Sequence, residues 1–217
     1  MAVDLQQQLL ELRREILAMG ALVEHRLGVA VQSLIHHDEA AATAVVRGDD
    51  DIDAYDTRIE AHAVRLLALA HPVAGDLRAI LASIRICTEF ERIGDLVKGI
   101  GKRSRKLSHT DAPLPALVVE LGMASRTMLS DVIAAYADSD PVLCRRLRNA
   151  DDRVDDLQKA VLLDLREHFR GTEEQLDAAI HWMAIAQRFE RIADTAVAVA
   201  EDVIFLVEGE VVRHAPA

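Results

Sequence analysis

Aromatic residues and cysteines are scarce in this chain of 217 residues. Only 3% of the residues are Phe, Trp or Tyr, although 51% are hydrophobic. Most of the apolar content is therefore Ala, Leu, Val and Ile, which can fill thin seams between helices without large rings. The two cysteines, Cys87 and Cys144, cannot form a disulfide framework. Both lie in helical patterns, where a free cysteine usually serves as a small apolar residue.

Glycine and proline are also sparse, with ten and five copies, so we expect few breaks and long helices. No stretch approaches the roughly 18 consecutive apolar residues that a membrane-spanning helix requires. The first residues show no basic segment followed by an apolar one, as a secretory signal would. The sequence therefore predicts a cytoplasmic protein with no membrane span.

Basic residues are fewer than acidic residues in this chain. The chain has 25 Lys and Arg residues against 36 Asp and Glu residues, which gives a formal net charge of −11 at pH 7. A protein that binds nucleic acid usually needs a basic surface that releases counterions from phosphates. We therefore predict no nucleic-acid partner. An acidic balance suits metal ions or basic partners equally and does not choose between them.

Apolar residues recur at helical spacing through most of the chain, and the third such stretch includes Leu77 and Leu81 on its apolar face. Asp38 is a candidate N-cap, Pro141 a candidate first helical residue and Gly209 a candidate C-cap. Gly48 is a candidate disturbance within the second helical stretch. The spacing and these signals predict helices over about residues 5–36, 39–70, 76–107, 116–137, 141–169 and 173–207.

The chain carries an internal repeat. The motif Phe-Glu-Arg-Ile-x-Asp occurs at residues 90–95 and again at 189–194, and Asp-x-x-x-Asp occurs at residues 49–53 and 151–155. Five identities in one window of six arise by chance in such a chain only on the order of a few per cent of the time. We interpret the repeat as a duplication and predict an all-α fold of two three-helix bundles, six helices in all. The predicted first bundle is 1–107, the linker with two prolines is 108–115, and the second bundle is 116–217.

Carboxylates four residues apart lie on one face of a helix, where like charges cost roughly 0.2–0.5 kcal/mol per pair. A bound cation would offset that cost, and oxygen-rich patches suit hard divalent cations or iron. The repeat therefore predicts two metal sites. Their candidate ligands are Asp49, Asp53, Glu91 and Asp95 in the first unit, and Asp151, Asp155, Glu190 and Asp194 in the second.

Other interpretations of these acids stay open. With 36 acids in the chain, about six such spaced pairs are expected at random, so spacing alone does not establish a metal site. The repeat could equally preserve a structural contact in which Arg92 and Arg191 pair with carboxylates across helices. A ferritin-like di-iron centre needs Glu-x-x-His, which does not occur in the sequence.

Signatures of common enzyme classes are missing from the sequence. It contains no glycine-rich phosphate loop, no nucleophile elbow and no Cys-x-x-Cys motif, so we predict that the protein is not an enzyme. The basic residues between Lys98 and Lys106 complement the end of a helix, and a contact with a partner or anionic lipid stays open as the alternative. We expect Trp182 and Met183 in the core, and the pair His36–His37 in solvent at a turn.

The acidic motifs carry a resemblance to a known family. Glu-Arg-Ile-Gly-Asp at residues 91–95 and Glu-Arg-Ile-Ala-Asp at 190–194 resemble the signature of the PhoU proteins, accessory regulators of the phosphate-specific transport system. His-Pro-Val-Ala-Gly-Asp-Leu-Arg at residues 71–78 and the segment 201–214 are similar to other parts of that family. The resemblance covers nearly the whole chain.

The resemblance implies two three-helix bundles side by side, with metal ions or multinuclear clusters held by the eight carboxylates named above. It also implies a negative regulator without catalytic activity. Such a protein links the ATPase of the phosphate transporter to a sensor histidine kinase when phosphate is plentiful, and so holds the starvation response off. Bundles of this shape often self-associate, so we also expect a homodimer, whose interface no feature of the sequence specifies.

The sequence departs from the family pattern in the first unit, and its two units also differ from each other. Lys102 stands where the family often has a carboxylate and would repel a cation, so we expect the first site to be weaker or differently occupied. Glu201 is retained at the matching place in the second unit, and Arg153 stands where the first unit has Asp51. Two other functions stay open: a metal-binding bundle for storage or metal-dependent catalysis, and a plain helical scaffold.

Overall fold

The computed structural model describes residues 4–168 and 171–212, and its regular structure in these ranges is entirely α-helical. The elements are α1 (Leu5–Ile35), α2 (Glu39–Arg47), α3 (Asp49–Leu69), α4 (Ala74–Leu107), α5 (Ala116–Asp138), α6 (Pro141–His168) and α7 (Glu173–Glu208).

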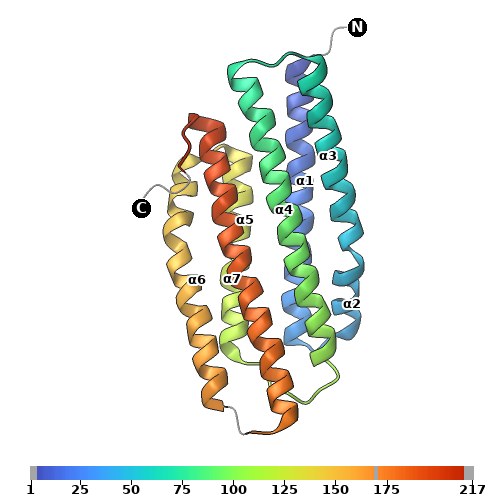
Figure 1. Ribbon diagram of the computed structural model, residues 1–217, viewed down its shortest axis with the longest axis vertical. Coiled ribbons are helices and arrows are strands. Elements are labelled where there is room, and N and C mark those ends of the chain that lie inside the picture. The colour runs from blue at the N-terminus through green and yellow to red at the C-terminus, as the bar shows by residue number, and fades with distance from the viewer. Residues whose placement is uncertain (1–3, 169–170, 213–217) are drawn as a thin grey trace.

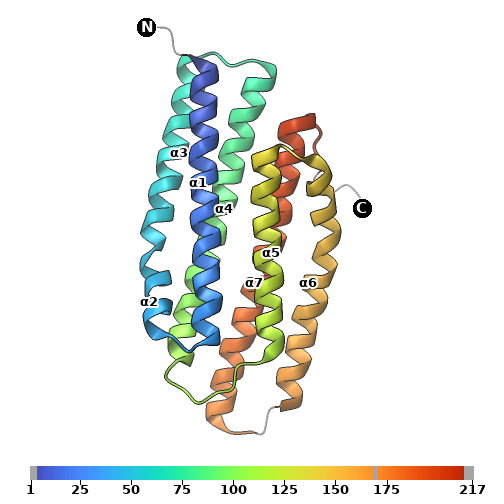
Figure 2. The same cartoon turned by 180° about the vertical axis from the view of Figure 1, so that it is seen from behind.

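The helices form two bundles that lie side by side along the long axis of the molecule (Figures 1 and 2). One bundle contains α1 to α4 and the other contains α5 to α7. The bundles meet where α4 packs against α7 and α1 packs against α5. The last helix of each unit therefore lies in the middle, which brings the two copies of the acidic motif to neighbouring helices.

The helix boundaries follow the capping signals. The Asp38 side chain accepts a hydrogen bond from the backbone N–H of Ala41 at 2.9 Å, as expected of an N-cap. Pro141 is the first residue of α6, and Gly209 ends α7 with a left-handed φ of 79°. The predicted end of the fifth helical stretch, Phe169, lies outside the described residues.

Gly48 divides the second helical stretch into α2 and α3, and a long side chain from α1 lies at this break. The Arg26 guanidinium lies against Gly48, where a Cβ would come within 1.9 Å of its Cζ. From there Arg26 donates to the Ala44 carbonyl oxygen at 3.1 Å and to Asp51 Oδ2 at 2.9 Å. Three helical stretches per unit are thus present as predicted, with a break in one of them.

Packing repeats along with the sequence. A Cβ on Gly20 of α1 would lie 3.0 Å from a ring carbon of Phe90, and one on Gly122 of α5 would lie 2.8 Å from a ring carbon of Phe189. Each glycine lets a buried phenylalanine from the last helix of its unit approach the first helix closely. These contacts show that the duplication reaches the core.

The free cysteines are buried, as predicted. Burial raises the pKa of the Cys87 thiol well above its usual range and that of Cys144 to about 12. Both thiols therefore stay protonated near neutral pH, and they serve as small apolar core residues.

The structure corrects the predicted core at two places. Trp182 is buried, but Met183 is 38% exposed. At the start of α4, Leu77 and Leu81 are 38% and 37% exposed, so this end of the predicted apolar face is not covered. Within the described part of the chain, no helix combines the length and apolarity that crossing a bilayer demands.

Candidate metal centres

Three carboxylates of the second unit converge between α6 and α7. Oxygen atoms of Asp151 and Asp155 from α6 and of Asp194 from α7 all lie within 4.8 Å of one another. The first two are one turn apart on α6, and the packing of α6 against α7 supplies the third. The Oδ1 atom of Asp151 is buried and has no hydrogen-bond partner among the described residues.

Burial and mutual repulsion both disfavour the charged forms of these acids. Burial raises the pKa of Asp151 to about 6, with a further contribution from Asp194 and Asp155. Burial is also the largest cause of the raised pKa values of Asp194 and Glu190, followed by the neighbouring carboxylates. Glu190 interacts electrostatically with the group of three, but its oxygens do not belong to it.

A hard cation fits this donor set. Oxygen ligands, convergent negative charge and a buried oxygen without a partner in the described structure are the features that Mg²⁺, Ca²⁺, Mn²⁺ or iron would satisfy. Such an ion would neutralise the repulsion among Asp151, Asp155 and Asp194 and connect α6 to α7.

The corresponding acids of the first unit contain a built-in cation. The Lys98 ammonium of α4 contacts Oδ2 of Asp49, whose side chain is 4% exposed. This hydrogen bond is the main reason that the pKa of Lys98 is raised. Burial, followed by the neighbouring carboxylates, raises the pKa values of Asp53 and Glu91. Asp95 acts electrostatically on both of these acids and is itself exposed.

The first unit therefore gathers its four predicted acids in one neighbourhood without forming a close three-carboxylate group among the described residues. Sequence reasoning missed Lys98. The signal that could have revealed it is its position, one helical turn after Asp95, where the second unit has Val197.

The other predicted residues have different partners from those expected. Arg92 pairs with Glu89 of its own helix at 3.7 Å, and the described residues contain no carboxylate within ion-pair distance of Arg191. The alternative of cross-helix Arg–carboxylate pairs was therefore wrong, although both arginines lower the pKa of Asp194 through space. Glu201 pairs with Arg148 at 3.7 Å.

Lys102 was predicted to weaken the first acidic site, but it instead lines a depression between α4 and α7. The cation that contacts a buried acid of the first unit is Lys98. Arg153 pairs with Glu120 at 3.5 Å, and Asp51 pairs with Arg26. If the first site binds metal more weakly, the lysine responsible is therefore Lys98 and not Lys102.

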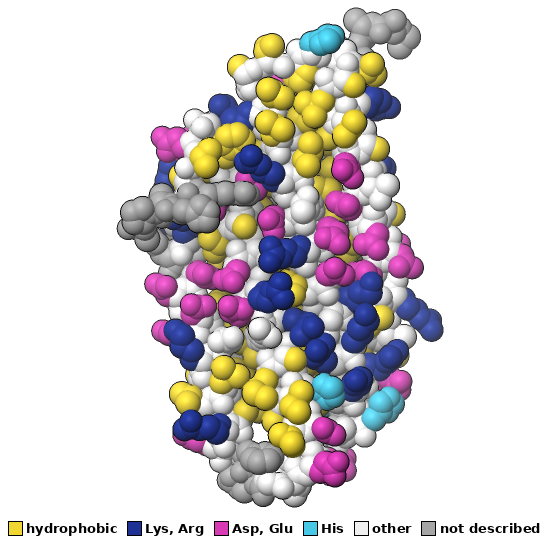
Figure 3. Space-filling view, viewed as in Figure 1, with side chains coloured by type: hydrophobic (Ala, Val, Ile, Leu, Met, Phe, Trp, Pro, Cys, Tyr) yellow, Lys and Arg dark blue, Asp and Glu magenta, His cyan; other side chains and the backbone are white. Residues whose placement is uncertain are grey.

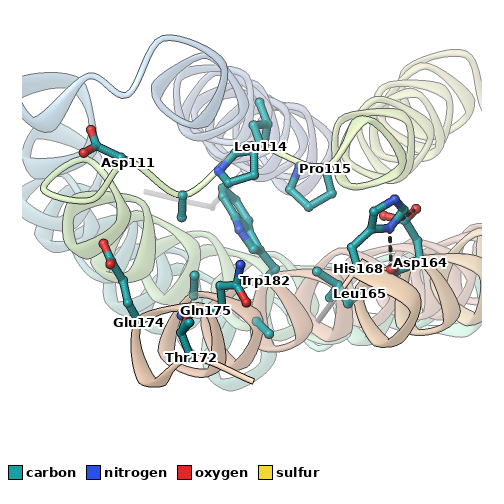
Figure 4. A pocket seen from close by; sticks show the side chains of 14 residues that line it. Asp111, Leu114, Pro115, Asp164, Leu165, His168, Thr172, Glu174, Gln175 and Trp182 are labelled. Carbon is teal, nitrogen blue, oxygen red and sulfur yellow. Dashed lines mark hydrogen bonds and ion pairs between the residues drawn. The ribbon is translucent and has the colours of Figure 1, made fainter. Parts of the chain in front are cut away.

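A separate cavity of about 670 Å³ lies between the 111–115 linker, the end of α6 and the start of α7 (Figure 4). Trp182, Leu165 and Pro115 contribute apolar side chains to its wall, and His168 bonds to the Asp164 carbonyl oxygen at 2.8 Å. Its polar groups do not form a convergent set of three ligands in the described residues. We therefore assign the candidate site to the acidic clusters.

Comparison with known proteins agrees with the repeat. A sequence model of the PhoU domain matches this chain twice, over residues 16–104 and 118–203. The chain belongs to the PhoU family. The PhoU homolog of Caulobacter vibrioides, a phosphate-specific transport system accessory protein, is 33% identical over 207 residues, which cover 94% of this chain and 90% of that protein. The Serratia marcescens PhoU protein is 31% identical over 208 residues, which cover 95% of this chain and 86% of that protein.

Solved PhoU structures have the same fold. The crystal structure of PhoU from Pseudomonas aeruginosa superposes with a TM-score of 0.90 at 30% identity, covering 95% of this chain and 100% of that one. The phosphate transport system regulatory protein PhoU from Streptococcus pneumoniae gives a TM-score of 0.89 at 25% identity, covering 96% of this chain and 99% of that one. The predicted tandem PhoU-like architecture is therefore confirmed.

Proposed function

We propose that this protein is a negative regulator of the phosphate-starvation response. It couples the phosphate-specific ABC transporter to its sensor histidine kinase when phosphate is plentiful. The observation that carries this proposal is the match of both halves to the PhoU domain. Relatives that share almost the whole length of the chain are named accessory proteins of the phosphate-specific transport system.

We also propose that the acidic cluster of the second unit binds a metal ion. Asp151, Asp155 and Asp194 bind one hard divalent cation or iron ion, with Glu190 nearby. The 4.8 Å grouping and the buried Asp151 oxygen, which no described residue satisfies, support this assignment. The ion neutralises the cluster and stabilises the α6–α7 contact.

A metal-storage bundle or a metal-dependent enzyme is the alternative that uses the same acids. The acidic cluster favours any of these metal-binding roles, so the roles must be separated by experiment. A regulator needs only an ion that stabilises its fold, whereas an enzyme also needs an open coordination position and a base beside it.

The test is genetic. Secreted phosphatase activity in phosphate-rich medium is measured with the gene deleted and then restored in the native host. Repression requires the activity to rise on deletion and to fall on restoration. An unchanged activity in the deletion strain would contradict the proposal.

Restoration with the Asp155→Asn/Asp194→Asn variant then tests whether the metal matters for regulation. When this variant is as abundant as the original protein, we expect it to restore repression only partly or not at all. The Asp164→Asn variant, altered in an acid of α6 outside the cluster, serves as the control and should repress fully.

A further inference from the structure

A depression of about 490 Å³ between α4 and α7 concentrates positive charge in an otherwise acidic protein. One carboxylate, Asp95, also lines it. Figure 3 shows Lys and Arg side chains gathered in the middle of this face, with acidic side chains on either side. The cations that line this basic groove are Arg92, Lys98, Lys102, Arg103, Arg188 and Arg191.

Only some of these cations have an acidic partner among the described residues. Lys98 contacts Asp49 and Arg92 contacts Glu89. By contrast, no described carboxylate forms an ion pair with Lys102, Arg103 or Arg188; the two arginines donate instead to backbone carbonyl oxygens of their own helices. The Nε atom of Arg103 is moreover buried, and no described residue accepts a hydrogen bond from it. An orphaned donor of this kind is costly unless a ligand or a water molecule accepts from it.

The crowding of cations in the basic groove is itself unfavourable. Burial lowers the pKa of Arg188, and the positive charges of Arg103 and Arg191 lower it further. Gly99 permits this crowding, because a Cβ at that position would lie 2.3 Å from Arg188 Nε. The glycine therefore lets the Arg188 side chain lie directly over α4. An anion between the helices would offset the repulsion.

Most cations of the basic groove are not shared by the two copies of the repeat. The positions in α7 that correspond to Lys102 and Arg103 of α4 are the acids Glu201 and Asp202. Conversely, Arg188 of α7 corresponds to Glu89 of α4. Apart from Arg92 and Arg191, which occupy equivalent positions, the cations of the two helices lie at different positions of the repeat, and they meet because α4 packs against α7.

We propose that the basic groove binds a small, multiply charged oxyanion of the phosphate class, either inorganic phosphate or a di- or triphosphate group. Guanidinium groups match the oxygens of a phosphoryl group with paired hydrogen bonds. The volume lies within the range of roughly 300–1,000 Å³ that small-molecule sites occupy. The acidic clusters on both sides would repel an extended polyanion, so a compact ligand fits the surface better than a nucleic acid or an acidic chain.

The proposal is tested with purified full-length protein that has been treated with a chelator and then dialysed, which removes binding through a metal. Isothermal titration calorimetry at constant ionic strength compares inorganic phosphate, tripolyphosphate and hexaglutamate. We expect tripolyphosphate or inorganic phosphate to bind more tightly than hexaglutamate. The stronger of the two identifies the source of the phosphoryl group. Failure of both phosphates to bind, or tighter binding of hexaglutamate, would overturn the proposal.

Variants locate the binding. Arg103→Gln and Arg188→Gln should each weaken binding about tenfold, because each removes a charge-assisted hydrogen bond. Lys159→Gln removes an equal charge from an exposed position on α6, where Lys159 pairs with Asp156, and should change the affinity less than about twofold. Arg103→Lys keeps the charge and should weaken binding less than Arg103→Gln does. Equal effects of all four substitutions would show that the phosphate binds elsewhere. The outcome does not depend on the proposed regulatory function, since it is measured on the isolated protein.

Discussion

The two acidic clusters differ in one decisive charge. In the first unit, Lys98 meets the buried carboxylate of Asp49. In the second unit, Val197 stands at the position of Lys98, and the matching Asp151 has a buried oxygen that no described residue satisfies. Two copies of one acidic motif on one fold thus neutralise their charge differently. The first uses a cation from its own chain, and the second is suited to a cation from solution.

The largest expected effect comes from giving the second unit the lysine of the first. Val197→Lys places an ammonium near Asp151, where it competes directly with a metal ion. We expect the affinity for Mn²⁺ to fall on the order of a hundredfold, because affinity at such sites depends on the net ligand charge. Isothermal titration calorimetry on chelator-treated protein measures the change.

Val197→Met is the matched control, since methionine has similar length and no charge. It should bind Mn²⁺ with nearly the original affinity. If Val197→Lys kept that affinity while folding normally by circular dichroism, the difference between the units would have another cause.

The reverse exchange, Lys98→Met, should open the first site at some cost in stability. It leaves Asp49 buried without a cation, which should lower the free energy of unfolding by about 2 kcal/mol in metal-free protein. Added Mn²⁺ should restore part of this loss and bind with one more ion per chain than in the original protein. Chemical denaturation with and without Mn²⁺ measures the stability, and calorimetric titration measures the number of ions.

Lys102→Met is the control for this exchange, because Lys102 is exposed in the basic groove and forms no ion pair with Asp49, which contacts Lys98 instead. It should leave both stability and the number of bound ions nearly unchanged. An equal loss of stability in the two variants would show that the Lys98–Asp49 contact is not what stabilises the first unit.

A smaller effect concerns pH. The native pKa of Asp151 is about 6, above its ordinary value of 3.8, so the native state holds more protons than the unfolded state between these pH values. The free energy of unfolding of metal-free protein should therefore fall as the pH rises from about 4 to 6, by an amount on the order of 1–2 kcal/mol. Asp151→Asn removes this cost.

The Asp151→Asn variant should accordingly be more stable than the original protein at pH 7 and about equally stable below pH 4, as measured by denaturation without metal. It should also lose the stabilisation by Mn²⁺. A variant that is less stable than the original at pH 7 would indicate that Asp151 makes a favourable native contact.

Much of the fold could be predicted from the sequence because helix periodicity, caps and the duplication are local signals. Asp38, Pro141 and Gly209 marked helix ends that the structure confirms. The surroundings of the acids could not be predicted in the same way. Whether Lys98 or Lys102 meets Asp49 depends on how α3 rotates against α4, and the exposure of Met183 depends on which face of α7 its neighbours cover.

The smallest expected effect tests whether the two cores are interchangeable. A Cβ on Gly94 would lie 3.0 Å from the Ile52 Cδ1 atom. The second unit has Ala193 and Val154 at the corresponding positions, so one side chain is larger by a methyl group and the other smaller. Gly94→Ala alone gains helix propensity but crowds Ile52, and we expect a net loss of about 1 kcal/mol.

Adding Ile52→Val to Gly94→Ala removes Cδ1, the nearer of the two methyl carbons that crowd the new Cβ, and should return the free energy of unfolding to within about 0.5 kcal/mol of the original. Chemical denaturation of both variants and of Ile52→Val alone completes the cycle. If the two free-energy changes simply add, residues 94 and 52 do not compensate each other. The pair Gly94/Ile52 would then pack differently from the pair Ala193/Val154, although the two pairs correspond in the repeat.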